Sequence, residues 1–250
     1  MNIFYLLYTE VLFRPLFNLL VGVTQLLPGH SIGLAIIVVT VIVRLVLLPS
    51  SLHQAKSMQK NQGKMAKMQA ELARIKKEHK DDQAKQAQAT MKLYKEAGIN
   101  PASGCLPLLI QLPILLALYR VFLTGIGPES YHFLYSFVAA PATIQTSFLG
   151  LSLTTPSLLF GILAGIGQFV QMKFFSPTPP PQPGADESTA KMMSSMQKNM
   201  AYMFPVMTVF IALRLPAALS LYWVVSTVLG LVQQYVLKRT LKLTGNPTAI

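Results

Sequence analysis

Residues 32–48 read IGLAIIVVTVIVRLVLL, an apolar run whose only charged residue is Arg44. The run approaches the roughly 20 residues that a helix needs to cross a bilayer. An arginine at the centre of a lipid-facing helix costs roughly 2.5 to 3.5 kcal/mol on insertion scales, so Arg44 is expected to face protein, water or a charged ligand. The alternative is that its side chain extends to the cytoplasmic headgroups, because Pro49 follows closely in the sequence.

The composition is that of a polytopic membrane protein. Of the 250 residues, 52% are hydrophobic and only 12% are charged, and the mean hydropathy is +0.46. We therefore expect an all-α fold with five transmembrane helices. Their predicted ranges are residues 31–52, 105–124, 157–174, 199–214 and 216–237. These ranges contain no Asp or Glu, so the sequence offers Arg44 no counter-ion within them.

Basic residues are concentrated between the first and second predicted crossings. Residues 54–97 contain eleven Lys or Arg, whereas residues 125–156 contain none. Because positively charged loops stay on the cytoplasmic side, segment 53–100 is predicted to be cytoplasmic and 125–156 to be an extracytoplasmic loop. The same orientation places a proline-rich linker, residues 175–198, and a short basic tail, residues 238–250, in the cytoplasm.

The first thirty residues allow two interpretations. The segment is apolar, but Glu10, Arg14 and Asn18 recur every four residues and form a polar stripe on one side of a helix. This pattern favours an N-terminal amphipathic helix, within residues 1–30, that lies in the outer membrane interface. The alternative is an additional crossing.

The cytoplasmic segment 53–100 has the pattern of two helices. Apolar residues recur at spacings of three and four between residues 65 and 75, and a polar break at residues 80–82 precedes a second helical stretch. We expect a basic antiparallel helical hairpin, whose predicted partner contacts are Lys67, Arg74, Lys76 and Lys77. Anionic lipids, the ribosome or an acidic targeting receptor would be attracted by this charge, and DNA is not an expected partner.

Polar and small residues share faces on three of the predicted crossings, and one of these faces includes Arg44. The candidate groove residues are Arg44, Thr40, Gln168, Gln171, Trp223, Ser220, Thr227 and Gln234. Three such faces would enclose a hydrated cavity around the arginine. The alternative is that the small residues and amides simply pack helices together, which is their commoner use in membranes.

Several motifs are specific to one family. The sequence reads GINPASGCLP at 98–107 and LIQLPI at 109–114, and Tyr222, Trp223 and the pair Gln233 and Gln234 follow in the last crossing. Together with Arg44, these motifs closely resemble the YidC/Oxa/Alb membrane protein insertases of the short bacterial type, from Ser31 to Arg239. Ala218 and Thr227 depart from the residues usual in that family.

The resemblance implies a multi-pass protein of the bacterial plasma membrane that acts as an insertase and chaperone. It would integrate short-tailed membrane proteins through a groove open to the cytoplasm and to lipid, in which Arg44 attracts acidic residues of the client. Gln168 and Trp223 would line the groove wall. The implied partners are nascent membrane protein clients and, with some of them, a Sec-type translocon. No nucleotide is required.

Other function classes lack the residues that they need. The predicted crossings contain no Asp, Glu or His, which argues against a proton relay and an intramembrane protease. Cys105 is the single cysteine and no His or Cys pair has metal-ligand spacing, so we expect no catalytic residue, metal or cofactor. A small-solute or anion channel or transporter, and a structural assembly factor, remain the alternatives. Arg120 and Lys173 lie nearer the ends of their crossings and are expected to reach the headgroups.

Overall fold

The computed structural model describes residues 3–80, 82–99, 106–175, 199 and 202–243. Most of these residues are helical, in agreement with the all-α membrane fold expected from the sequence. Most of the predicted linker 175–198, the end of the tail and the motif residues 100–105 lie outside the described residues.

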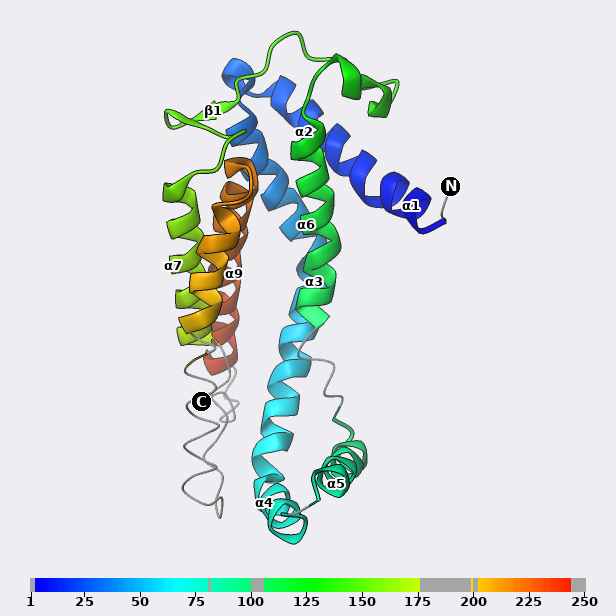
Figure 1. Ribbon diagram of the computed structural model, residues 1–250, viewed down its shortest axis with the longest axis vertical. Helices are drawn as coiled ribbons and strands as arrows, with labels where there is room; N and C mark the ends of the chain where they lie inside the picture. Colours follow the sequence, from blue (N-terminus) through cyan, green and yellow to red (C-terminus); the bar gives the residue numbers. More distant parts are fainter. Residues whose placement is uncertain (1–2, 81, 100–105, 176–198, 200–201, 244–250) are drawn as a thin grey trace.

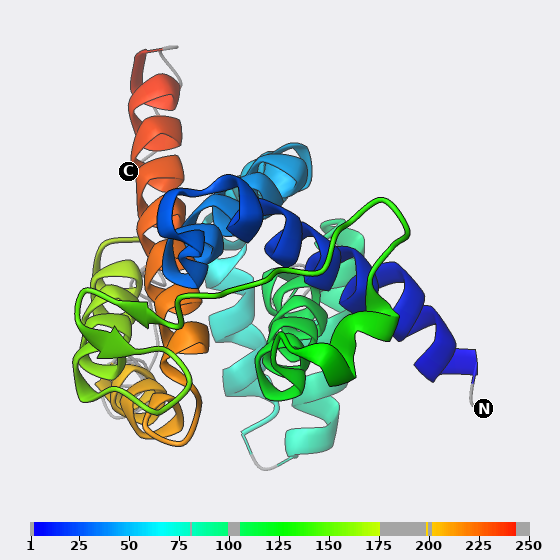
Figure 2. The ribbon, with the colours of Figure 1, turned by 90° about the horizontal axis from the view of Figure 1, so that it is seen from above.

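The N-terminal segment is one nearly continuous helical rod that begins with α1 (Ile3–Tyr8). A π-helical stretch, η1 (Thr9–Phe13), and α2 (Arg14–Leu26) follow. The rod crosses obliquely over one end of the helical bundle, where α2 contacts α3 and α6 (Figure 1). Figure 2 shows the same crossing from above. The rod's own side chains Phe13, Phe17 and Leu20 are fully buried.

A short 3-10 turn, η2 (Pro28–His30), leads into the long helix α3 (Ile32–Lys67). The hydroxyl oxygen of Ser31 accepts a hydrogen bond from the Leu34 N–H at 3.5 Å and caps the first turn. α3 runs without a break from the first predicted crossing far into segment 53–100. Pro49 lies inside it and leaves the Leu45 carbonyl without its main-chain donor, yet the helix continues.

The chain bends at Met68, and the two shorter helices α4 (Gln69–Glu78) and α5 (Gln83–Glu96) follow. They contact each other at the end of the molecule opposite to the N-terminal rod (Figure 1). The Lys64 ammonium of α3 donates hydrogen bonds to the carbonyls of Ala97, at 2.7 Å, and Gly98, at 3.2 Å. These contacts tie the C-terminal end of α5 to α3.

The second half of the chain begins with α6 (Leu106–Thr124) and a 3-10 turn, η4 (Pro128–Phe133). Two short strands, β1 (Ser147–Phe148) and β2 (Leu151–Ser152), form an antiparallel hairpin that the sequence pattern did not predict. α7 (Leu158–Phe175), a helix over Tyr202–Ala212 and α9 (Ala217–Leu243) complete the bundle. α9 packs against α3, α6 and α7 and is therefore its central helix.

Among the described residues, three helical stretches are long and apolar enough to cross a membrane: Tyr5–Leu26, Ile32–Ser57 and Ala217–Leu237. Shorter apolar helices cover Gln111–Thr124, Leu158–Lys173 and Tyr202–Ala212. These lengths agree with a membrane protein. The predicted set of five crossings is not established by them, and the N-terminal stretch satisfies the length criterion as well.

The polar stripe of the N-terminal rod contacts protein. Asn18 is 4% exposed, and its side chain donates to the Phe133 carbonyl at 3.0 Å and accepts from the Tyr135 N–H at 2.7 Å. Arg14 donates to the same Phe133 carbonyl at 3.3 Å. The stripe therefore holds the loop that follows α6, because it satisfies main-chain groups that the loop cannot pair itself.

Arg120 differs from the expectation that it reaches the headgroups. Its guanidinium donates to the Tyr5 hydroxyl at 2.7 Å and to the Thr9 hydroxyl at 3.0 Å. The guanidinium also lies 4.3 Å from the centre of the Phe13 ring. α6 and the N-terminal rod are thus joined through this arginine, because aromatic rings and hydroxyls solvate the cation within the protein.

Candidate functional site

Arg44 lies on α3 and points toward α9. Its Nη2 atom donates hydrogen bonds to the main-chain carbonyl of Ser226, at 2.6 Å, and to the Ser226 hydroxyl, at 2.8 Å. Ser226 is 4% exposed, whereas Arg44 is only partly buried. One end of the guanidinium is therefore fixed against α9 by a single residue.

Gly230 lies one turn after Ser226 and borders this contact. A Cβ atom at Gly230 would lie 3.4 Å from Arg44 Nη2 and 3.5 Å from Gln171 Nε2. In an α-helix the Gly230 N–H also faces the Ser226 carbonyl, so Arg44 uses the remaining lone pair of that oxygen. The guanidinium and the Gln171 amide thus both lie beside Gly230 on α9.

Tyr222 extends the same face of α9 by one turn in the other direction. Its hydroxyl accepts a hydrogen bond from the Gln111 side chain of α6 at 2.7 Å. Positions 222, 226 and 230 recur every four residues and therefore lie one above another on the helix. We call Arg44, Gln171, Tyr222, Ser226 and Gly230 the Arg44 cluster; its residues come from α3, α7 and α9.

A further polar contact joins α3 and α9 beyond the Arg44 cluster. The Gln233 side chain donates to the Ser51 hydroxyl at 2.8 Å. Ser51 lies two turns after Arg44 on α3. Side-chain hydrogen bonds thus join α3 and α9 at two points that are about two helical turns apart.

The guanidinium keeps unused donor capacity. Within the described part of the chain, no carboxylate pairs with Arg44 and no hydrogen bond is found for its Nη1 or Nε atoms. Arginine has five N–H donors, and a carboxylate binds it most strongly through two parallel hydrogen bonds. Both paired edges of the guanidinium include Nη2, which Ser226 occupies, so Nε and Nη1 offer separate N–H donors.

Among the predicted groove residues, only Gln171 is shown beside Arg44. Thr40 is buried, and its hydroxyl donates to the Ile36 carbonyl of its own helix at 2.6 Å. The Thr227 methyl group lies against Gly167, 3.1 Å from where a Cβ would stand, which is a packing contact between α9 and α7. Gln168 and Trp223 are partly buried.

Two predicted groove residues carry buried oxygens without a partner among the described residues. They are the hydroxyl of Ser220 and the side-chain oxygen of Gln234. Burying an unpaired polar atom is costly, so each site is a place where water or another polar group would be favourable. Neither residue contributes a hydrogen bond to the Arg44 cluster.

Sequence reasoning missed Ser226, Tyr222 and Gln111 as site residues. The signal was present, because Tyr222, Ser226, Gly230 and Gln233 recur at spacings of four and three. The predicted groove face used the neighbouring register of Ser220, Trp223, Thr227 and Gln234 instead. Both registers are polar, and only the packing of α9 against α3 distinguishes them.

The predicted cytoplasmic contacts lie on α3 and α4. Lys67, Arg74 and Lys77 are exposed, while Lys76 is partly buried. Arg74 forms an ion pair with Glu78 at 2.7 Å, and this hydrogen bond lowers the pKa of the Glu78 carboxyl. Exposed pairs of this kind contribute little to stability, so these helices present mainly a positively charged surface.

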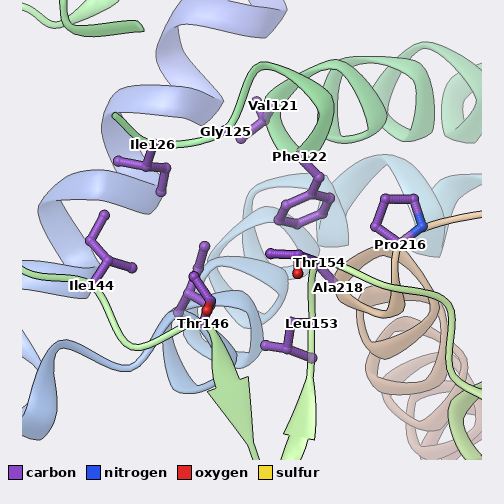
Figure 3. A pocket seen from close by; sticks show the side chains of 11 residues that line it. Val121, Phe122, Gly125, Ile126, Ile144, Thr146, Leu153, Thr154, Pro216 and Ala218 are labelled. Carbon is purple, nitrogen blue, oxygen red and sulfur yellow. The ribbon is translucent and has the colours of Figure 1, made fainter. Parts of the chain in front are cut away.

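A small cavity lies at the other end of α9 from the Arg44 cluster. Its volume is about 70 Å³, and its walls are largely apolar. Figure 3 shows Phe122 of α6, Leu153 of the loop and Pro216 before α9 around it. The cavity does not include Arg44, so the predicted hydrated groove is not this cavity.

Comparison with known proteins identifies close relatives. Residues 23–244 match the model of the family described as 60Kd inner membrane protein. A protein of Fusobacterium nucleatum named membrane protein insertase YidC is 34% identical, over 91% of this chain and 96% of its own length. Membrane protein insertase MisCB of Bacillus subtilis is 37% identical, over 93% of this chain and 80% of its own. The Pelagibacter ubique insertase YidC is 36% identical, but the chain spans only 38% of its length.

Proposed function

The chain belongs to the 60Kd inner membrane protein family, whose relatives are named membrane protein insertase YidC, and on this premise we propose how it inserts its clients. The Arg44 cluster is the polar centre of a groove open to the cytoplasm and to lipid. An acidic residue near the end of a client chain accepts hydrogen bonds from the remaining N–H donors of Arg44, on Nε or Nη1. Ser226 meanwhile holds Nη2 and orients the guanidinium.

The free energy of insertion comes from the client itself. Transferring an apolar helix from water into lipid is favourable by roughly 25 cal/mol per Å² of apolar surface, so no nucleotide is needed. The groove has only to let a short polar terminus pass while the apolar helix leaves sideways into lipid. Arg44 attracts this terminus and releases it again, because its carboxylate contact is in reach of water.

The proposed topology keeps five crossings, with α4 and α5 and the C-terminal tail in the cytoplasm. The eleven basic residues between positions 54 and 97 support this orientation. The exposed Lys67 and Lys77 are then available to anionic lipid headgroups, the ribosome or a targeting receptor, and a Sec-type translocon assists with some clients. The protein acts as an insertase and chaperone and performs no covalent chemistry.

One observation carries the proposal. Arg44 is a partly buried cation in a long apolar helix, and within the described residues it is held by neutral oxygens alone. A fixed cation without a counter-ion is costly in a membrane, and such residues mark functional sites. The positive charge and the remaining N–H donors favour an anionic ligand.

The test is reconstitution of the purified chain in liposomes with a single-span client that bears a short acidic outer terminus. Protease protection of that terminus measures insertion. The expected result is efficient insertion without nucleotide, reduced when the acidic residues are replaced by Asn and Gln. Failure to insert the acidic client would contradict the proposal. Anion flux in the same liposomes separates it from the channel alternative, which predicts flux without a client.

A further inference from the structure

The turn between β1 and β2 contains an unusual leucine. Phe148 pairs with Leu151, so the turn consists of Leu149 and Gly150 alone. Both residues have positive φ, 52° for Leu149 and 77° for Gly150. Two-residue turns of this kind favour Asn followed by Gly, because a branched side chain is strained in the left-handed region.

Packing within the chain does not explain the leucine. Leu149 is 80% exposed, among the highest values of the large apolar side chains. Leu149 therefore carries two unfavourable free-energy contributions: backbone strain at positive φ, and exposure of its apolar side chain to water. Both costs point to a contact outside the chain.

The turn is held rigidly by its surroundings. The Phe148 ring lies so close to Gly33 of α3 that a Cβ there would approach it to 2.5 Å. The Ile32 N–H donates to the Gln145 carbonyl at 3.1 Å, and the Ala218 N–H of α9 donates to the Leu153 carbonyl at 2.9 Å. The hairpin therefore rests on the first turns of α3 and α9, where Figure 1 shows it.

The surrounding sequence identifies the contact as lipid. From residue 134 to residue 157 the chain has no Asp, Glu, Lys, Arg or His. An exposed loop that faced bulk water or an oppositely charged protein would be expected to carry charges. The apolar surface also continues into α7, where Leu158 is 60% exposed and Leu159 is 53% exposed.

We propose that the β1–β2 hairpin is a membrane anchor whose tip, Leu149, inserts into the lipid leaflet at this end of the bundle. The ends of α3 and α9 fix the hairpin, and the leaflet covers the leucine. The strained turn places an apolar side chain at its outermost point, and a polar Asn would not insert. The hairpin thereby sets the depth of the bundle in the bilayer, independently of the insertase activity.

The experiment places an environment-sensitive NBD probe at the tip. A chain with Cys105→Ala and Leu149→Cys is labelled and reconstituted in liposomes that contain nitroxide lipids. The expected result is blue-shifted emission and an about twofold or greater loss of fluorescence to shallow nitroxides, as for a group in the interface. A matched chain with Glu129→Cys, on the same loop but at an exposed charged position, should show neither effect.

Two results would overturn the proposal. One is a water-like, unquenched probe at position 149. The other is a probe that is shielded yet unaffected by nitroxide lipids, which would mean that protein covers the tip. Since the label itself could disturb the turn, a second chain with Leu149→Trp and Trp223→Phe is examined by quenching with brominated lipids. The brominated lipids should quench the fluorescence of the introduced tryptophan. An unquenched signal in a folded chain would also contradict the proposed membrane anchor.

Discussion

The two halves of α9 are held by different forces. At the start of the helix, Ala217, Leu219 and Leu221 are almost completely buried, and main-chain hydrogen bonds join Ala217 and Ala218 to the loop before α7. Toward its end, α9 meets α3 through the hydrogen bonds of Ser226 and Gln233, while Val232, Tyr235 and Val236 are exposed. One end is a close-packed apolar core and the other is joined by a few polar contacts.

This difference indicates where the bundle can open. Apolar packing is lost over its whole area when helices separate, whereas a few hydrogen bonds can be exchanged for contacts with water or a client. In the proposed mechanism, the stretch of α9 from Ser226 to Gln233, which bonds to Arg44 and Ser51, is the part that admits a polar segment. The apolar start of the helix keeps the bundle together.

The largest expected effect is on the close-packed end. Leu219→Ala should lower the free energy of unfolding by about 2–5 kcal/mol, because it leaves a cavity at a position that is 1% exposed. Val232→Ala, on the lipid-facing side of the same helix and 55% exposed, should change it by about 0.5 kcal/mol or less. Denaturant unfolding in detergent micelles measures both. Equal losses would show that the two halves are packed alike.

Arg44→Ala should reduce insertion of an acidic client about tenfold or more, because hydrogen bonds to charged groups contribute roughly 1.5–3 kcal/mol. Arg44→Lys should retain more activity than Arg44→Ala, since the charge remains but the paired donors are lost. Neutralising the client should diminish the defect. An equal defect for acidic and neutral clients would instead assign Arg44 a role in folding.

Gly230→Ala tests the close approach of Arg44 to α9. The added methyl group would lie 3.4 Å from Nη2 and 3.5 Å from Gln171 Nε2, at the near limit of ordinary van der Waals contact, so the expected cost is below about 1 kcal/mol. Insertion of an acidic client and the melting temperature in micelles are the measurements. Gly22→Ala is the control, because a Cβ there meets nothing within 4 Å and should be neutral or slightly stabilising. A much larger loss of insertion would show that the guanidinium cannot shift away from the added methyl group.

Ser226→Ala removes only one of the two acceptors of Arg44, because the main-chain carbonyl remains. We expect insertion of an acidic client to fall about fivefold, the equivalent of roughly 1 kcal/mol for one hydrogen bond. Ser226→Thr should restore it, since it returns the hydroxyl. Thr208→Ala removes a buried hydroxyl from another helix and serves as the control. A loss that Thr fails to rescue, or that neutral clients share, would point to packing.

The smallest effect concerns the exposed cytoplasmic helices. Asp82 caps α5 by accepting from the Lys85 N–H at 2.9 Å, and its contacts with Lys85 lower the pKa of the Asp82 carboxyl below 3.8. A lowered pKa means that this stabilisation is present above pH 3.8 and disappears as the pH falls through the lower value. The protection factors of α5 amides should therefore fall as the pH drops below 3.8, while amides of buried α9 residues near Leu219 keep theirs. The Asp82→Asn chain should lose this pH response.

The helices of the membrane region were largely predictable because their apolar runs are long. The ranges expected for the first and last crossings lie within α3 and α9 apart from one flanking residue each, Ser31 and Pro216. The β1–β2 hairpin was not predictable, because two-residue strands leave no periodic pattern and its turn carries Leu149 where Asn is expected. The hydrogen bonds of Arg120 to the N-terminal rod could not be predicted from the sequence, because the residues that accept them lie more than 100 positions away along the chain.

The sequence by itself determined that this chain is a helical membrane protein of the insertase family with one arginine inside its first long apolar run. Composition and motif spacing carry that information, because they depend only on neighbours along the chain. Tertiary structure decided which face of α9 meets that arginine. Ser226 and Gly230 became its partners through helix packing, since two polar registers on one helix are equivalent until another helix covers one of them.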